Sequence, residues 1–133
     1  MKSGIAVLAA LAVGAVAAAQ PAPSSGDPGR GERVYRERCS GCHSLDANRI
    51  GPAHRGVFGR RVGQAPGFNY SPALRRANLL WTPANLDRWL TNPQALIPGQ
   101  RMNFRLADPA LRADVIAYLR LQSMRAPRAA IDR

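Results

Sequence analysis

Hydrophobic residues recur at the three- and four-residue spacing of a helix in several stretches, and each stretch follows a polar residue and a proline. Asp, Ser and Thr side chains can cap a helix, and proline suits its first position. The pairs are Asp27-Pro28, Ser71-Pro72, Thr82-Pro83 and Asp108-Pro109. No stretch shows the strict alternation typical of a strand. The sequence therefore predicts an all-α fold with four short helices.

The hydrophobic stripe is clearest after Asp108, from Leu111 to Leu119, and it is shorter after Thr82, where Pro93 should end the helix. Between residues 51 and 67, five glycines and two prolines leave little periodicity. A structureless loop of this length is unusual in a small domain, and four short helices supply few large apolar residues. The sequence thus indicates that the chain alone does not provide its whole core.

The first 19 residues have the layout of a secretory signal peptide, with Lys2, an apolar run and a small-residue end. An uncleaved membrane anchor is less favoured, because the run is short for a hydrocarbon core of about 30 Å. We expect four parts: 1–19 a cleaved signal peptide, 20–30 a flexible lead-in, 31–122 one domain, and 123–133 a basic tail.

Arginine dominates the charge. The sequence holds 18 arginines and eight acidic residues, and Lys2 is its one lysine, so the chain after residue 19 carries a net charge of +10. This charge favours an acidic partner surface or anionic lipid. Nucleic acid is not an expected partner, because the arginines are scattered and the chain is exported.

Both cysteines lie in the segment Cys39-Ser40-Gly41-Cys42-His43, which could serve a disulfide, a zinc ion or a haem. Thioredoxin-like disulfides usually follow a strand, and none is predicted here. Zinc would require His43 and His54, although structural sites favour histidines three to five residues apart, beyond the cysteines. A haem would use both cysteines and the histidine, since the two thiols can form thioethers and His43 can bind iron. A covalent haem would also complete the core.

Three side chains could bind the iron opposite His43. Met124 lies in the basic tail, and His54 lies only 11 positions after His43 in the glycine-rich loop. Met102 follows the turn Ile97-Pro98-Gly99, which can bring the chain over the far side of the haem. An isolated methionine is often a packing residue, but this position makes Met102 the predicted ligand.

Several segments closely resemble the soluble class I cytochromes c of the mitochondrial and bacterial periplasmic type. In chain order they are Gly51-Pro52, GVFGRRVGQAPGFNYSPA, Trp81, TNPQALIPGQRMNF and DVIAYL. The resemblance extends from about Gly31 to Leu121. It implies one covalent haem c with thioethers at Cys39 and Cys42, and with His43 and Met102 as axial ligands.

The resemblance also implies supporting roles around the haem. The Pro52 carbonyl would accept a hydrogen bond from the second nitrogen of His43 and fix its tautomer. Arg60, Tyr70 and Trp81 match positions that pair with the haem propionates, which need partners when they are buried.

Other matches concern the helix crossing and the surface. Gly31 and Tyr35 resemble the contact of the first helix with the last, near Ile116 and Tyr118. Phe104 matches an aromatic residue beside the exposed haem edge. The basic positions retained at the docking face or near it are Arg38, Arg101 and Arg105.

The chain departs from the family pattern at several places. The loop after His43 is about three residues shorter. The substituted positions are Trp89 for tyrosine, Gln100 for threonine, Leu74 for a polar residue, His54 for an apolar residue, and Gln94 and Ala95 for docking lysines.

The resemblance implies a mobile single-electron carrier in the periplasm and not an enzyme. Its partners would be membrane respiratory or photosynthetic complexes with acidic docking faces. We expect a monomer that contacts the membrane surface only transiently. The alternative is a haem enzyme, or a sensor of gas or peroxide, if the Met102 ligand is labile.

Overall fold

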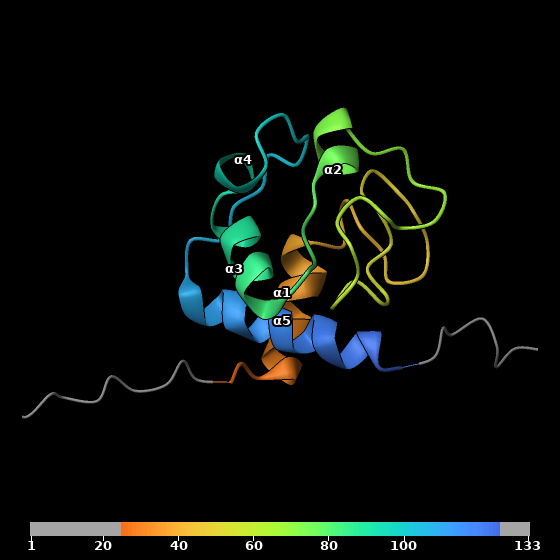
Figure 1. The fold of residues 1–133 in the computed structure, drawn as a ribbon. Coiled ribbons are helices and arrows are strands. Elements are labelled where there is room, and N and C mark those ends of the chain that lie inside the picture. Colours follow the sequence, from red (N-terminus) through yellow and green to blue (C-terminus); the bar gives the residue numbers. More distant parts are fainter. Residues whose placement is uncertain (1–24, 126–133) are drawn as a thin grey trace, which may run out of the picture.

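The structure is a computed structural model, and it describes residues 25–125. The expected signal peptide, residues 20–24 of the expected lead-in and residues 126–133 of the expected tail lie outside this range. The described part contains five helices and no strand, with one isolated bridge between Arg61 and Leu80. The helices are α1 Pro28–Arg38, α2 Pro72–Arg76, α3 Pro83–Thr91, α4 Pro93–Leu96 and α5 Pro109–Ser123 (Figure 1). The predicted all-α fold is confirmed.

Each helix begins with a polar cap followed by proline. The Asp27 carboxylate accepts a hydrogen bond from the Arg30 N–H at 2.8 Å, and Ser71, Thr82 and Asp108 cap α2, α3 and α5 in the same way. The four predicted helices are therefore present. The fifth, α4, was not predicted: Asn92 caps it, and Pro93 both ends α3 and begins α4.

Helices α1 and α5 cross closely and form the base of the molecule (Figure 1). At the crossing, a Cβ on Gly31 would lie 2.0 Å from the Asp114 carbonyl oxygen and 2.9 Å from the Tyr118 Cβ. Only glycine permits this approach. Tyr35 packs on Tyr118 with ring centroids 5.3 Å apart. The predicted contact between the first and last helices is thus confirmed.

A group of hydrogen bonds to Asp114 extends this crossing toward the N-terminus of α1. The Asp114 carboxylate accepts from the Arg30 side chain at 2.8 and 3.0 Å and from the Asp27 N–H at 2.7 Å. Helix α1 begins at Pro28, three residues before the domain boundary expected at Gly31. The hydrogen bonds to Asp114 thus involve residues before that boundary.

Above this base, the loops from residue 43 to 70 lie on one side, and α3, α4 and the segment after them lie on the other (Figure 1). Backbone hydrogen bonds join the loops to the segment that leads into α3. They run from Trp81 N–H to the Arg60 carbonyl at 2.8 Å and from Gly59 N–H to the Trp81 carbonyl at 2.9 Å. The Phe58 N–H donates to the Ser123 Oγ at 3.1 Å, which attaches the loops to α5.

Arg112 connects α5 to the segment that returns from α4. Its guanidinium donates to Asp87 at 2.6 Å on α3 and to the carbonyls of Leu106 and Ala107 at 2.9 and 2.8 Å. The Leu106 N–H donates in turn to the Leu90 carbonyl at 2.8 Å. Among the described helices, none is long and apolar enough to span a bilayer.

Candidate functional site

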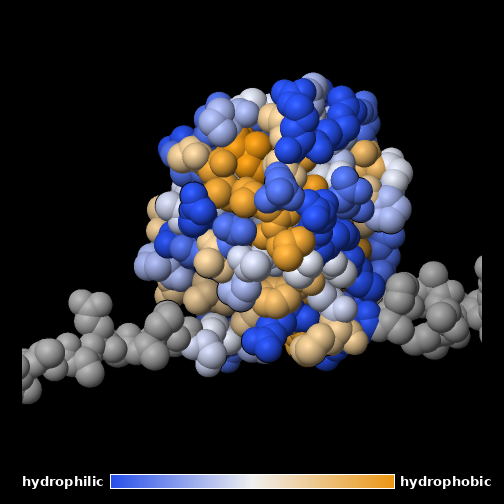
Figure 2. Space-filling model, viewed as in Figure 1, coloured by the Kyte–Doolittle hydropathy of each residue, from blue (hydrophilic) through white to orange (hydrophobic). Residues whose placement is uncertain are grey.

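A cavity of about 650 Å³ lies between the loops on one side and α3 with its following segment on the other. Its walls include every predicted site residue, namely Cys39, Cys42, His43, Pro52, Arg60, Tyr70, Trp81 and Met102. Apolar residues from α3 and α5 complete the lining, among them Leu86, Leu90, Val115 and Leu119. Figure 2 shows apolar residues gathered in the upper part of one face and bordered by hydrophilic residues.

The cysteines and His43 lie in the turn that ends α1. Cys39 caps the helix, and its carbonyl accepts from the N–H groups of Cys42 at 3.1 Å and His43 at 2.9 Å. The two thiols are free, and burial, followed by the charge of Cys42, raises the pKa of Cys39 to about 11.

His43 makes one side-chain hydrogen bond and one close backbone contact. Its Nδ1 lies 2.9 Å from the Pro52 carbonyl oxygen, which fixes Nδ1–H as the donor and leaves Nε2 unprotonated for a ligand bond. Burial lowers the pKa of His43, and the Pro52 hydrogen bond partly opposes that shift. A Cβ on Gly51 would lie only 2.1 to 2.6 Å from three atoms of the ring, so the backbone of Gly51 contacts it directly.

Arg60 provides an unusual donor at the cavity wall. Its terminal nitrogens donate to the carbonyls of Arg55 at 3.3 Å and Ala53 at 3.2 Å. Its buried Nε has no hydrogen-bond partner among the described residues. Desolvation lowers the pKa of Arg60, and Tyr70 opposes that shift. A buried donor without a hydrogen-bond partner, here the Nε, is costly. The site therefore favours an anionic group beside Arg60.

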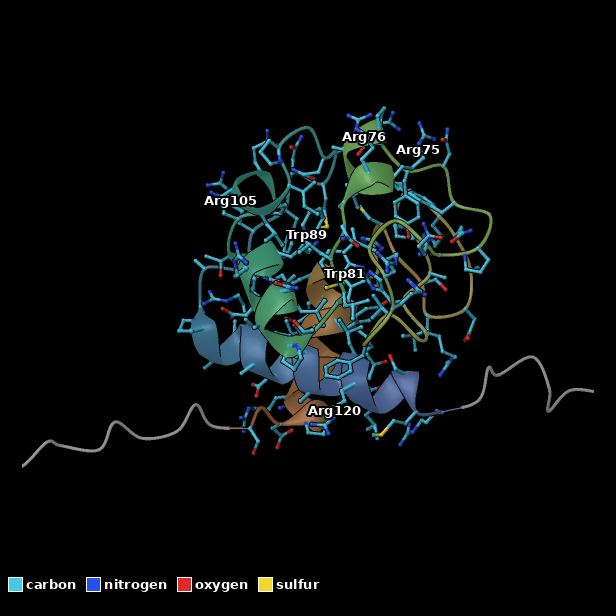
Figure 3. All side chains as sticks on the ribbon, viewed as in Figure 1. Arg75, Arg76, Trp81, Trp89, Arg105 and Arg120 are labelled. Atoms are coloured by element: carbon cyan, nitrogen blue, oxygen red, sulfur yellow. The ribbon has the colours of Figure 1, made fainter. Side chains whose placement is uncertain are left out.

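Tyr70 and Trp81 flank the same part of the cavity. The Tyr70 hydroxyl accepts from the Ala65 N–H at 3.1 Å and keeps its own proton for donation. Trp81 packs edge to face on Trp89, with ring centroids 5.2 Å apart. Both indoles lie at the centre of the molecule, whereas the labelled arginines lie at its periphery (Figure 3).

Met102 lies in the segment between α4 and α5. Gly99, with φ of +88°, turns the chain there, and the Met102 N–H donates to the Gln100 side-chain oxygen. Gln100 also donates to Gln94 at 3.4 Å. The side chain of Gln100 therefore holds the turn that presents Met102, a hydrogen bond that could not be predicted from the sequence.

His54 lies beside His43 in the cavity wall. The two rings are stacked, with centroids 4.0 Å apart and planes inclined by 19°. His54 Nδ1 is hydrogen-bonded to the Tyr35 hydroxyl at 3.2 Å. Burial lowers the pKa of His54 well below its usual value, and His43 and Arg60 lower it further. A ring stacked on His43 does not lie opposite it, which argues against His54 as the distal ligand.

Arg38, Ile50, Arg101 and Phe104 line the cavity where it reaches the surface. Ile50 is 79% exposed, an unusual value for a large apolar side chain. In the described range, no three or more His, Cys, Asp or Glu side chains are grouped so that they could hold a metal ion.

Comparison with known proteins identifies the family. The family model described as Cytochrome c matches residues 29–123. The chain belongs to the cytochrome c family. A cytochrome c2 from Rhodomicrobium vannielii is 43% identical to it over 103 residues, which are 74% of this chain and 82% of that protein.

Two further cytochromes c support this assignment. A cytochrome c-type cyt cy from Rhodobacter capsulatus is 43% identical over 101 residues, which are 74% of this chain and 51% of that protein. A solved structure, cytochrome cH from Methylobacterium extorquens, is 38% identical with a TM-score of 0.69, covering 72% of this chain and 99% of the other. The predicted family and fold are confirmed, and the chain is a c-type electron carrier with one covalent haem.

The residues around the cavity fit a haem c. The volume, about 650 Å³, lies within the range of roughly 300–1,000 Å³ usual for cofactor sites. Two free thiols, an imidazole nitrogen and a thioether sulfur line one apolar space. The unpaired Nε of Arg60 offers a partner for a carboxylate of the cofactor. Each chemical part of a haem c thus finds a suitable group in this chain.

Proposed function

We propose that Cys39 and Cys42 form the two thioethers and that His43 and Met102 are the axial ligands. One observation carries the proposal: these four side chains line the same cavity, and they come from segments on its two sides. The hydrogen bond of His43 to Pro52 supports its role, because it leaves Nε2 available to the iron.

We further propose that Arg60, Tyr70 and Trp81 bind the haem propionates. Arg60 has an unsatisfied Nε, and Tyr70 retains a proton to donate. The backbone bond from Trp81 to Arg60 fixes the spacing of these two residues. Together they would offset the cost of burying carboxylates.

These roles support a carrier and not an enzyme. When bound, haem c supplies a reversible one-electron change at its iron, and histidine–methionine ligation sets a high reduction potential. With His43 and Met102 both holding the iron, a substrate would have to displace one of them. The hydrogen bonds that hold Met102 through Gln100 and Leu106 disfavour a labile methionine and hence the enzyme or sensor alternative.

We propose a mobile role in the periplasm, between membrane respiratory or photosynthetic complexes. The signal-peptide pattern of residues 1–19 supports export. Arg38 and Arg101 lie at the cavity mouth, where they would attract an acidic docking face, and the exposed Ile50 offers a small apolar contact. Contacts of this kind favour short, salt-sensitive encounters.

Spectroscopy tests the ligand assignment. The purified protein is expected to keep its pigment through acid–acetone extraction and, when oxidised, to show the weak red absorption band that marks an iron–methionine bond. Met102→Ala should remove this band while the pigment remains covalently attached. Extraction of the pigment would refute the thioethers, and a band that survives in Met102→Ala would refute the methionine assignment.

Kinetics with a cytochrome bc-type complex test the carrier role. The double variant Arg38→Gln/Arg101→Gln should lower the bimolecular electron-transfer rate and weaken its dependence on salt. Arg75→Gln/Arg76→Gln removes the same charge from α2, where both residues are exposed and outside the cavity lining (Figure 3). Equal effects of the two double variants would contradict docking at the cavity mouth.

A further inference from the structure

His54 makes contacts that the proposed electron-carrier function does not by itself require. Its ring covers a face of His43, with a centroid distance of 4.0 Å, and it is anchored at two points. The Tyr35 hydroxyl is hydrogen-bonded to Nδ1 at 3.2 Å, and the His54 backbone N–H donates to the Ser44 carbonyl at 3.0 Å. The hydrogen bond at Nδ1 and the stacked neighbour restrict rotation of the His54 ring, and the backbone hydrogen bond fixes its main chain.

Tyr35 is itself fixed by the helix crossing. Its side chain is only 4% exposed, it meets Tyr118 of α5 at 5.3 Å, and its ring meets the edge of His54 at 5.6 Å. A continuous set of ring contacts therefore connects α5, α1, His54 and His43. The α1–α5 crossing is the most extensive helix contact in the described part of the chain. The ring contacts therefore start from a well-packed part of the molecule.

The Pro52 hydrogen bond alone does not fix the plane of the His43 ring. A single hydrogen bond at Nδ1 fixes the tautomer and the position of one ring atom. The ring can still rock about that bond, because the second side-chain torsion of histidine is broad. A parallel ring at 4.0 Å restricts this rocking, since tilting His43 would drive it into His54.

We propose that His54 is a positioning residue, held by Tyr35, that fixes the plane of the His43 ring beneath the haem. This inference depends on the proposed role of His43 as an axial ligand. Groups around a ligating histidine orient it and tune the metal. Here an aromatic stack performs that task together with the backbone carbonyl of Pro52.

The orientation of an axial imidazole can be measured directly. In an oxidised low-spin haem, the plane of the imidazole, together with the orientation of the opposite ligand, determines how the unpaired spin is shared among the four ring methyl groups. The proton resonances of these methyls therefore report the ring plane, and loss of stability alone does not rearrange them. This readout is independent of electron-transfer activity.

The test uses the oxidised holoprotein and three variants. His54→Leu removes the stack, and we expect it to change the order or the spread of the four methyl resonances by several ppm. His54→Phe keeps a flat ring in place, and we expect a pattern close to that of the parent. Tyr35→Phe keeps the stack but removes one anchor, and we expect a smaller shift in the direction seen for His54→Leu.

A matched control separates positioning from stability. Phe58→Leu truncates a half-buried aromatic residue that is outside the cavity lining, so it should lower the unfolding midpoint without rearranging the methyl resonances. If His54→Leu leaves the resonances unchanged while the pigment stays covalent and the red band persists, this inference fails and the proposed function stands. If His43→Ala retains the parent's methyl pattern, His43 is not the ligand, and the proposed function fails with the inference.

Discussion

At the scale of single residues, the position of His43 depends on the absence of a side chain at Gly51. A methyl group there would lie 2.1 to 2.6 Å from the ring, well inside van der Waals contact, so the ring or the backbone would have to move. Overpacking of this kind costs about 1–3 kcal/mol. We expect Gly51→Ala to lower the free energy of unfolding of the holoprotein by that amount, as measured by urea denaturation.

Gly41 provides the matched control for this prediction. It lies between the two cysteines, and a Cβ there would meet no atom within 4 Å. Gly41→Ala should therefore change the free energy of unfolding by no more than about 0.5 kcal/mol. Similar losses in both variants would show that the contact with His43 is not the cause.

The side chain of Gln100 governs a second local feature, the turn before Met102. Gln100→Ala removes the acceptor for the Met102 N–H, and the loss of such a hydrogen bond costs about 0.5–1.5 kcal/mol. We expect the red iron–methionine band to disappear at a lower urea concentration than in the parent. Gln94→Ala removes only the weak 3.4 Å bond to Gln100 and should leave that concentration nearly unchanged. The same midpoint for Gln100→Ala and the parent would contradict the role of this bond.

The candidate thioether and iron ligands could be proposed from the sequence because each carries its own chemical signal. The family resemblance is instead the basis for the roles of Pro52, Arg60, Tyr70 and Trp81. Two thiols and an adjacent imidazole, or a methionine after a proline–glycine turn, can be recognised without a structure. The stack of His54 on His43 could not, because it depends on Tyr35 of α1, which lies 19 positions before His54. Such contacts arise only when distant segments pack together.

At the scale of elements, helix starts were predictable and helix number was not. Cap and proline form a local signal, so the starts of α1, α2, α3 and α5 follow from the sequence. Asn92-Pro93 carries the same signal for a helix start. Because proline also stops helices, the sequence alone predicted only that α3 ends there. The four-residue α4 depends on packing of the returning segment and has no hydrophobic stripe of its own.

The attachment of α1 to α5 through Asp114 predicts a specific dependence on pH. The hydrogen bond from Arg30 lowers the pKa of Asp114, desolvation opposes this shift, and the Asp27 N–H supports it. A carboxylate with a depressed pKa stabilises the fold above its unfolded value of about 3.9. The contribution is lost as the pH falls through the lower pKa of the folded state.

Asp114→Asn should therefore be less stable than the parent at neutral pH, and the difference should shrink on acidification below about pH 4. Thermal unfolding at several pH values measures this. Arg36→Gln removes an arginine from the same helix as Arg30, one whose pair with Glu32 is exposed. Exposed ion pairs contribute little, so this variant should differ little from the parent at any pH. A difference between Asp114→Asn and the parent that stays constant with pH would contradict the prediction.

At the scale of the whole molecule, the cavity determines whether the chain can fold without its cofactor. An apolar cavity without its occupant costs stability, because the atoms that line it lose packing contacts. The cavity here measures about 650 Å³, whereas a domain is usually stable by only about 5–15 kcal/mol. We therefore expect that the chain does not stay folded around this space without its cofactor.

The double variant Cys39→Ala/Cys42→Ala tests this coupling, because it removes both thiols while retaining His43 and Met102. After any loosely held pigment is extracted, we expect far-ultraviolet circular dichroism to show most of the helical signal lost, with no cooperative thermal transition. The single variant Cys42→Ala, with one thioether left, should stay folded at a reduced melting temperature. The pigment-free double variant could instead keep the helical content of the holoprotein and unfold cooperatively. That result would show that the chain folds without the cofactor and that the cofactor fills a cavity already present.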